Sequence, residues 1–203
     1  IGAAADLTAL PHCQHSDAAG ATYIGAGICM TRDPDSRIRN SAFLRHQIKG
    51  PRKTGFLAVP RHTWRHFQKY EKAGLPMAMA IVIGVHPAYE IAACHTGKFD
   101  EDELELAAVL LREPVELVRC ETIDMEVPAT AEVVIVDNAL PGVREDEGPF
   151  GEVTTYMAGQ GKNPVFEVTA MSMRGDAIYR HIQATRFTVQ ILDTEIAGVR
   201  HAR

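Results

Sequence analysis

The stretch Ala78-Met-Ala-Ile-Val-Ile-Gly84 is wholly apolar and has the length of a buried strand. Before it, residues 60–74 predict a helix, because Trp64, Phe67 and Tyr70 recur at helical spacing and Gly74 follows. After it, residues 87–94 predict a second helix, which begins at a proline. The middle of the chain is therefore predicted to run from helix to strand to helix.

Short strand patterns surround this centre. On the N-terminal side they fall at residues 23–31, 40–47 and 55–59, with Asp33-Pro-Asp-Ser36 as the turn of a hairpin. On the C-terminal side a helix opens at residues 100–103, and its expected buried face consists of Leu104, Ala107, Ala108 and Leu111. Strands are predicted at residues 115–119, 124–127 and 132–136, a loop at 140–151, and a late strand pair at 166–174 and 178–182. Many short strands with three helices predict an α+β fold, built as a curled antiparallel sheet or a small barrel.

The charge balance and the cysteines limit the classes of function. The 203 residues include 21 basic and 26 acidic ones, and the resulting net charge of −5 argues against a nucleic-acid coat or a polybasic membrane anchor. No apolar run reaches about 18 residues, so no membrane span is expected. Four single cysteines (Cys13, Cys29, Cys94 and Cys120) form no CxxC pair, which argues against a zinc ribbon and favours buried, reduced thiols in a cytoplasmic protein. The chain begins with Ile1 rather than Met, so we expect a processed or incomplete chain.

Two glycine patterns and one histidine pair carry little chemistry. Gly25-Ala-Gly27 lacks the third glycine of a dinucleotide loop, and Gly159-Gln-Gly161-Lys162 is followed by Asn163 rather than the Ser or Thr of a P-loop. His62 and His66 lie four residues apart, which places them on one face of the predicted helix. His66 is expected to be a core or solvated histidine, whereas His62 stands at the helix start, where amide N–H groups are open to a ligand.

The segment Glu147-Gly-Pro-Phe-Gly-Glu152 is the strongest candidate for chemistry. Two carboxylates flank a rigid Gly-Pro and a second glycine, so the backbone between them is shaped rather than free. Two carboxylates brought close together differ in how readily each takes a proton, and an arginine between them can hold one ionised. The segment is interpreted either as a solvated acidic loop or as an active-site loop held in place by Phe150.

This segment, EGPFGE, resembles the signature of the UbiD family of decarboxylases, which use prenylated FMN. Further blocks are similar to the family in order and spacing across nearly the whole chain: Asn40-Ser-Ala-Phe-Leu-Arg45, Pro60-Arg-His62, Ile83-Gly-Val-His-Pro87, Glu103-Leu-Glu-Leu-Ala-Ala with Glu113-Pro-Val-Glu-Leu-Val-Arg-Cys120, Val127-Pro-Ala-Thr-Ala-Glu132, and Met173-Arg174 with Ile178-Tyr179. The resemblance implies that residues 1–188 are the family's central prenylated-FMN-binding catalytic domain, and that 189–203 are a divergent tail. It also implies a split β-barrel of the FMN-binding type with flanking helices. A homo-oligomer is expected if the full-length protein has the family's C-terminal domain.

The resemblance also assigns the site residues. Arg45, Glu147 and Glu152 are implied to form the catalytic network. Asn40, His62 and Glu103 are implied to hold Mn²⁺ or Mg²⁺ at the cofactor phosphate, a set of hard oxygen ligands with one imidazole that suits these ions. Potassium is expected near the same phosphate. The implied cofactor-lining residues are Ala42, Phe43, Leu44, Arg45, Arg61, His62, Ala93, Cys94, His95 and Glu103.

The implied function is the reversible, non-oxidative decarboxylation of an aromatic or α,β-unsaturated carboxylic acid. Glu152 is expected to deliver the proton that replaces the carboxylate, while Arg45 orients the substrate and keeps Glu147 charged. A flavin prenyltransferase is the expected supplier of the cofactor. Two alternatives stay open: a flavin-binding module that needs a partner chain or missing domains for catalysis, and a non-catalytic remnant of the fold.

Overall fold

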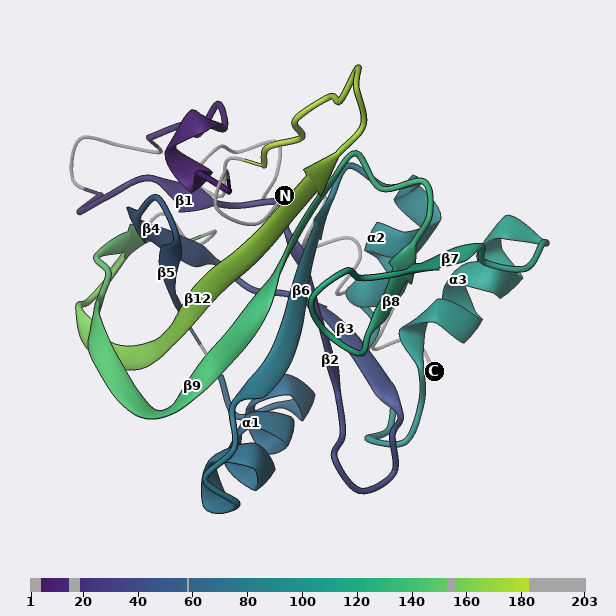
Figure 1. The fold of residues 1–203 in the computed structure, drawn as a ribbon, viewed down its shortest axis with the longest axis horizontal. Coiled ribbons are helices and arrows are strands. Elements are labelled where there is room, and N and C mark those ends of the chain that lie inside the picture. Colours follow the sequence, from purple (N-terminus) through teal and green to yellow (C-terminus); the bar gives the residue numbers. More distant parts are fainter. Residues whose placement is uncertain (1–4, 15–18, 58, 153–155, 183–203) are drawn as a thin grey trace.

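The computed structural model describes residues 5–14, 19–57, 59–152 and 156–182, so the predicted tail 189–203 lies outside the described residues. Within these ranges the chain forms three α-helices and a large antiparallel sheet, which is the expected α+β fold (Figure 1). A short 3-10 helix at Leu7–Ala9 precedes them. The helices are α1 (His62–Lys72), α2 (Pro87–Ala93) and α3 (Glu103–Leu111).

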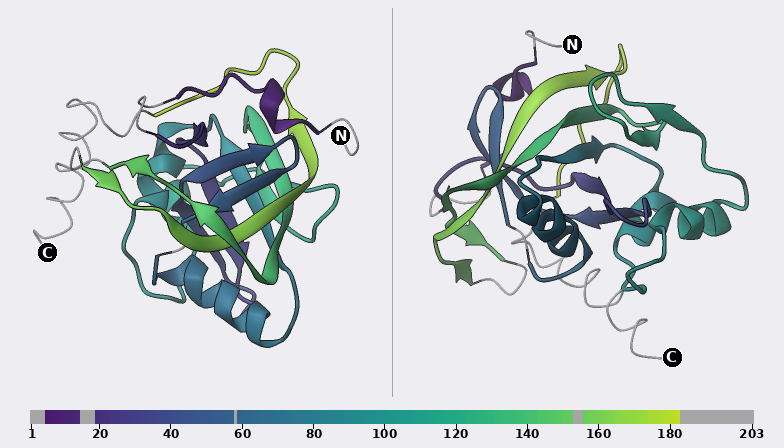
Figure 2. Two further views of the ribbon diagram at one scale, coloured as in Figure 1. Left: turned by 90° about the vertical axis from the view of Figure 1, so that its left-hand side faces the viewer. Right: turned by 60° about the horizontal axis from the view of Figure 1, so that its bottom comes forward.

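The large sheet has eight strands in the order β1-β4-β5-β12-β9-β6-β2-β3, and all neighbours pair antiparallel. Its strands are β1 (Tyr23–Ile24), β2 (Ile28–Arg32), β3 (Arg39–Phe43), β4 (His46–Gly50), β5 (Lys53–Phe56), β6 (Met77–Ile83), β9 (Val133–Glu147) and β12 (Gly161–Met173). Two small pairs accompany it: β7 (Leu117–Arg119) with β8 (Glu126–Pro128), and β10 (Phe150–Gly151) with β11 (Met157–Ala158). Figure 2 shows the strong curl of the sheet along β9 and β12. Among the described residues no pairing joins the edge strands β1 and β3, so the sheet is open.

The central strand β6 is buried on both faces, which explains its apolar sequence. Met79 and Ile81 belong to one core cluster with Phe67 of α1, whereas Ala80 and Val82 pack into a second cluster under α2 and α3. Helix α1 contacts β6 and β9, and helices α2 and α3 contact each other and β3. The sheet therefore separates two hydrophobic layers, and β3 lies where the helices of both layers approach it.

The first hairpin is confirmed, and its return strand is divided. Asp33 closes the turn by accepting hydrogen bonds from the amides of Asp35 (2.8 Å) and Ser36 (3.0 Å). The predicted strand 40–47 breaks after Phe43: β3 pairs with β2, whereas β4 pairs with β1 and β5. The chain thus changes neighbours at Leu44 and Arg45, and those two residues lie outside the ladder.

The predicted loop at 140–151 is wrong over most of its length. Strand β9 continues to Glu147, since β12 supplies backbone partners along the whole segment, up to the pair Gly161 with Glu147. The polar and glycine-containing sequence looked like a loop because this end of the ladder leaves the core; Gly142 and Val143 are exposed there. Long-range pairing has overridden local preference.

The predicted strand at 178–182 is also wrong. Residues 174–182 follow β12 without strand structure, and side-chain contacts hold them instead. The amide of Ile178 donates to Glu132 (3.1 Å), Tyr179 contacts His12 (3.0 Å), and Arg180 pairs with Glu90. Alternating apolar residues therefore mark contacts with separate elements here, not a ladder.

All four cysteines are free, but only Cys29 is buried, and Cys13 is exposed. The expectation of buried thiols therefore fails for Cys13, which lies in the irregular N-terminal segment. In the described ranges, no helix combines the length and the apolar character that crossing a membrane requires.

Candidate active site

Arg45 lies between the end of β3 and the start of β4. Its side chain therefore does not have to follow the alternation of strand side chains between the two faces of the sheet. The side chain of Arg45 is only 9% exposed. Nε and Nη2 donate to Oε1 and Oε2 of Glu147, both at 3.0 Å, which is the bidentate geometry that carboxylates prefer. Nη1 donates to Glu152. One arginine therefore joins the two carboxylates of the EGPFGE segment, as the sequence implied.

Glu147 is the last residue of β9, and its side chain is fully buried. Asn163 of β12 adds a third hydrogen bond, from Nδ2 to Oε2 at 3.2 Å. A buried carboxylate is stable only when its oxygens are paired in this way. The chain then turns at Gly148, whose φ of +98° favours glycine.

Glu152 is 39% exposed, so the two carboxylates of the segment have different surroundings. Between them, the Phe150 ring lies against the Arg45 guanidinium (4.8 Å) and the Tyr23 ring (4.6 Å). The Tyr23 hydroxyl donates to the Pro149 carbonyl at 3.4 Å. Burial, together with the charge of Glu147, raises the pKa of Tyr23 to about 12, so this hydroxyl keeps its proton. Phe150 is therefore held in place by these contacts, as the active-site interpretation of the segment required.

A cavity of about 490 Å³ adjoins this network through Leu44, the neighbour of Arg45 in the chain. The predicted cofactor-lining residues surround it, with the exception of Arg45 itself, and all three predicted metal ligands line it. Its full lining is Asn40, Ser41, Ala42, Phe43, Leu44, Val59, Pro60, Arg61, His62, Thr63, Ala93, Cys94, His95, Thr96 and Glu103.

The cavity lies between the edge strand β3, the start of α1, the end of α2 and the start of α3. The free edge of β3 points into it, because the amide of Ser41 donates to Glu103 rather than to a strand (2.7 Å). Amides alternate along a strand, so Phe43 presents its amide to the same side. Helix α1 begins at the cavity, and its N-cap residue Arg61 makes no side-chain cap bond. The first-turn amides of α1 are therefore suited to an anion such as phosphate.

The polar side chains of the cavity fit a divalent metal and a phosphate. Asn40 donates through Nδ2 to Thr63 (2.9 Å), which leaves its carbonyl oxygen for a ligand. Burial raises the pKa of Glu103 to about 7, so a bound cation would favour its ionised form. The Ser41 hydroxyl is buried and has no hydrogen-bond partner within the part of the chain that the structure describes. Among the described residues, no group of three or more His, Cys, Asp or Glu side chains could hold a metal ion, and the set here reaches three ligands only with the amide oxygen of Asn40.

The two histidines of α1 have different surroundings. His66 is buried and contacts Thr31 (3.0 Å), which confirms the expected core histidine. His62 lines the cavity, and burial lowers its pKa. Sequence reasoning missed Tyr23 and Asn163. Tyr23 carried no signal, and Asn163 is recognisable only once the register of β9 and β12 brings it beside Glu147.

Fold and site define a class: an α+β domain in which an arginine joins two carboxylates beside a cavity that lies at the start of a helix. The chain belongs to the UbiD family, whose model, described as the 3-octaprenyl-4-hydroxybenzoate carboxy-lyase Rift-related domain, matches residues 1–186. The family expected from the sequence is thereby confirmed.

Named relatives are decarboxylases. The chain is 38% identical over 188 residues to anhydromevalonate phosphate decarboxylase of Methanothermobacter thermautotrophicus, covering 93% of this chain and 44% of that protein. It is 30% identical over 178 residues to phenolic acid decarboxylase of Bacillus subtilis, covering 85% and 38%.

Solved structures agree. This chain is 45% identical to the UbiD-class enzyme HmfF from Pelotomaculum thermopropionicum, whose structure was solved in complex with FMN, and the two structures superpose with a TM-score of 0.94. The match covers 97% of this chain and 44% of HmfF. An evolved dimeric form of HmfF in complex with prFMN gives the same identity and TM-score, with 97% and 46% covered. The chain therefore spans less than half the length of these relatives.

Proposed function

We propose that this chain is the cofactor-binding catalytic domain of a prenylated-FMN-dependent decarboxylase. The reaction is the reversible, non-oxidative loss of CO₂ from an aromatic or α,β-unsaturated carboxylic acid. The observation that carries the proposal is Arg45, held between a buried and a half-exposed glutamate next to the cavity. The decarboxylases among the relatives support the reaction class, and phenolic acid decarboxylase favours an aromatic acid.

The cavity would hold the cofactor. The free edge of β3 at Ala42 to Leu44, together with Arg61, Ala93, Cys94 and His95, would line the flavin, with its phosphate at the start of α1. Asn40, His62 and Glu103 would hold Mn²⁺ or Mg²⁺ at that phosphate, with K⁺ nearby. When bound, prenylated FMN supplies an electrophile that accepts electrons from the unsaturated substrate. On this proposal, the curled sheet is a split β-barrel, residues 1–188 are the central prenylated-FMN-binding catalytic domain, and residues 189–203 are a divergent tail.

Arg45 would orient the substrate carboxylate. Three hydrogen bonds from Arg45 and Asn163 hold the side chain of Glu147, so the Arg45–Glu147 pair stays fixed. The Nη1 group contacts the more exposed Glu152. When Glu152 takes a proton, its attraction for Arg45 weakens, and Nη1 becomes available to the carboxylate of the substrate.

Glu152 would then act as the general acid. After CO₂ leaves, the carbon that carried it needs a proton, and the protonated Glu152 carboxyl provides one and returns to its ionised form beside Arg45. Glu147 cannot replace it, because its side chain is fully buried and both of its oxygens are bonded. The difference in exposure supports this division of roles.

The second candidate is a flavin-binding module that needs further domains or a partner chain for catalysis. It is favoured by the length comparison, since the chain covers only 44% of anhydromevalonate phosphate decarboxylase and of HmfF. The difference between the two candidates lies in turnover, because both bind the flavin.

The test uses the full chain co-expressed with a flavin prenyltransferase and purified with Mn²⁺ and K⁺. Absorbance spectra and intact mass give cofactor content, and CO₂ release is measured with phenolic and α,β-unsaturated acids. We expect about one cofactor per chain and turnover of at least one acid. Glu152→Gln should keep the cofactor and lose about 10²-fold or more of the turnover.

Glu167→Gln is the matched control, because Glu167 is an exposed glutamate on β12. It should keep full turnover. An active Glu152→Gln enzyme would overturn the proton-donor role. A chain that binds the cofactor but turns over no acid would favour the partner-dependent module.

A further inference from the structure

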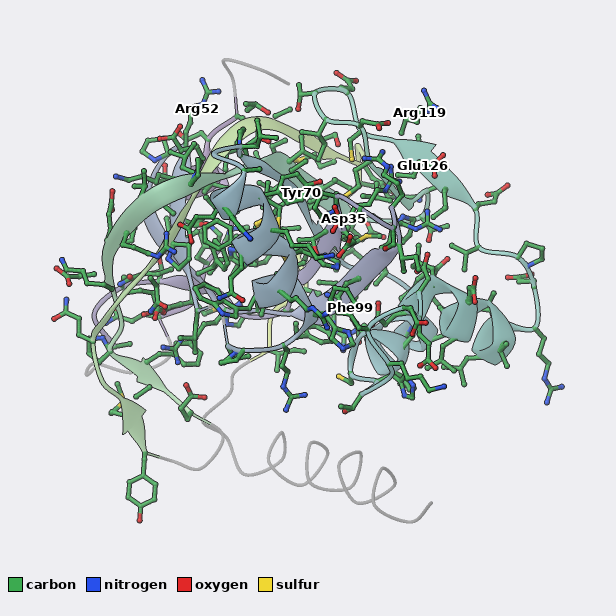
Figure 3. All side chains as sticks on the ribbon, turned by 90° about the horizontal axis from the view of Figure 1, so that it is seen from below. Asp35, Arg52, Tyr70, Phe99, Arg119 and Glu126 are labelled. Carbon is green, nitrogen blue, oxygen red and sulfur yellow. The ribbon has the colours of Figure 1, made fainter. Side chains whose placement is uncertain are left out.

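Phe99 lies in the connection between α2 and α3 and packs across one face of α1 (Figure 3). Four side chains of that face surround its ring. His62 and His66 meet it edge-on, with ring centroids 5.4 and 5.3 Å away and interplanar angles of 87° and 76°. The Arg65 guanidinium lies 4.2 Å and the Lys69 ammonium 5.4 Å from the ring centroid.

These contacts follow the helical repeat. Measured from His62, the other three residues stand at positions i+3, i+4 and i+7, which form one stripe on α1. The negative face of an aromatic ring attracts cations, so Arg65 and Lys69 favour an aromatic side chain here over an aliphatic one. A single phenylalanine thus covers two turns of the helix.

The stripe itself is fixed to the sheet. Lys69 donates to Asp33 at 2.6 Å, and His66 contacts Thr31 at 3.0 Å. Asp33 and Thr31 belong to the β2–β3 hairpin, whose second strand supplies the edge of the cavity. Phe99 therefore rests on a rigid surface, although it comes from a connection without regular structure.

Phe99 also joins two sides of the cavity. On one side is α1 with Arg61 and His62, and on the other is the 93–103 segment with His95, Thr96 and Glu103. His62 is only half-buried, and its helix start lacks a side-chain cap. The ring contact from Phe99 restrains the orientation of this imidazole from the side of the connection.

We propose that Phe99 is a positioning residue of the cofactor cavity: it orients His62 and sets the spacing between α1 and the segment that ends at Glu103. The inference rests on the proposed function, in which His62 and Glu103 bind the same metal ion. Residues that orient metal ligands contribute substantially to metal affinity, and their loss costs about 10- to 100-fold.

The experiment measures Mn²⁺ and FMN binding in the full chain. Mn²⁺ affinity is read from the electron paramagnetic resonance of the free ion, and FMN affinity from fluorescence quenching with and without Mn²⁺. Phe99→Ala should weaken Mn²⁺ binding, and the Mn²⁺-dependent part of FMN binding, about tenfold. Phe99→Tyr keeps the ring and should restore both. Phe99→Leu, which keeps the apolar bulk, should fold and still lose affinity.

Tyr70→Leu is the control, because it removes a ring from α1 at a residue that packs against the core cluster (Figure 3). It should bind both probes as the wild type does. Folded Phe99→Ala and Phe99→Leu proteins with wild-type affinities would overturn the positioning role while the proposed function stands. A wild-type chain that binds neither Mn²⁺ nor FMN would overturn the proposed function and the positioning role with it.

Discussion

Asn163 supplies the third hydrogen bond to the buried carboxylate of Glu147, at 3.2 Å. Replacing it with alanine removes that bond without touching the two bonds from Arg45. A hydrogen bond to a buried charge is worth about 1.5–3 kcal/mol, so we expect Asn163→Ala to lower kcat about 10-fold or more. KM should change little, because Glu147 does not itself hold the substrate. Steady-state CO₂ release measures both values.

Lys162→Ala is the neighbouring control, since Lys162 pairs with Asp146 at the surface. Its kcat should equal that of the wild type. An Asn163→Ala enzyme with unchanged kcat would show that the Arg45 pair alone positions Glu147.

The three charged residues of the network were implied by the family resemblance, because EGPFGE and the Asn40 to Arg45 block each resemble a block of the UbiD family. The sequence could not predict Tyr23 and Asn163. Tyr23 reaches the loop through Phe150 and Pro149, which lie more than a hundred residues further along the chain. Such contacts depend on which distant segments come together in the fold, and no pattern near Tyr23 indicates its partners.

At the scale of elements, Asp33 links the β2–β3 turn to α1. Burial alone would raise the pKa of Asp33, but hydrogen bonds from Lys69 and from the amides of Ser36 and Asp35 outweigh burial and lower it to about 2. The folded-state pKa lies below the ordinary value of 3.8. The carboxylate therefore stabilises the fold above about pH 4, and this stabilisation is lost as the pH falls through about 2.

Asp33→Asn should thus reduce the free energy of unfolding by about 2 kcal/mol at neutral pH, and by far less near pH 2. Urea unfolding at several pH values measures the difference. Asp35→Asn is the control, because Asp35 also pairs with Lys69 but is 76% exposed, and such exposed pairs contribute little. A deficit of equal size at both ends of the pH range would contradict the electrostatic explanation.

Sequence patterns predicted those helices and turns that are fixed by contacts between residues close together in the chain. Pro87 starts α2, Asp102 caps α3 and Asp33 turns the first hairpin, each through contacts within a few residues. The predictions were wrong where pairing with a strand far away in the sequence decides whether a segment forms a strand. The outer half of β9 is a strand because β12 lies beside it, and residues 178–182 are not one because no strand of the described chain pairs with them.

At the scale of the whole molecule, a ligand that binds only the folded state raises its stability. FMN with Mn²⁺ at about 100 times the dissociation constant should add about 2.7 kcal/mol. For a domain of this size, that corresponds to a rise in Tm of about 5–10 °C. Differential scanning fluorimetry of the full chain measures it. EDTA should remove the part of the rise that depends on the metal, and a Tm indifferent to FMN would contradict a flavin site.

Glu103 bonds the amide of Ser41 on an edge strand of the sheet, and this has a consequence for handling the protein. Unpaired strand edges are the places where sheets of different molecules join, and a charged side chain on the edge prevents it. Because it occupies the Ser41 amide, Glu103 is expected to keep this edge from pairing with a strand of another molecule. We expect a Glu103 variant to lose soluble yield as well as the Mn²⁺ affinity of the proposed site, so its binding should be measured on the soluble fraction.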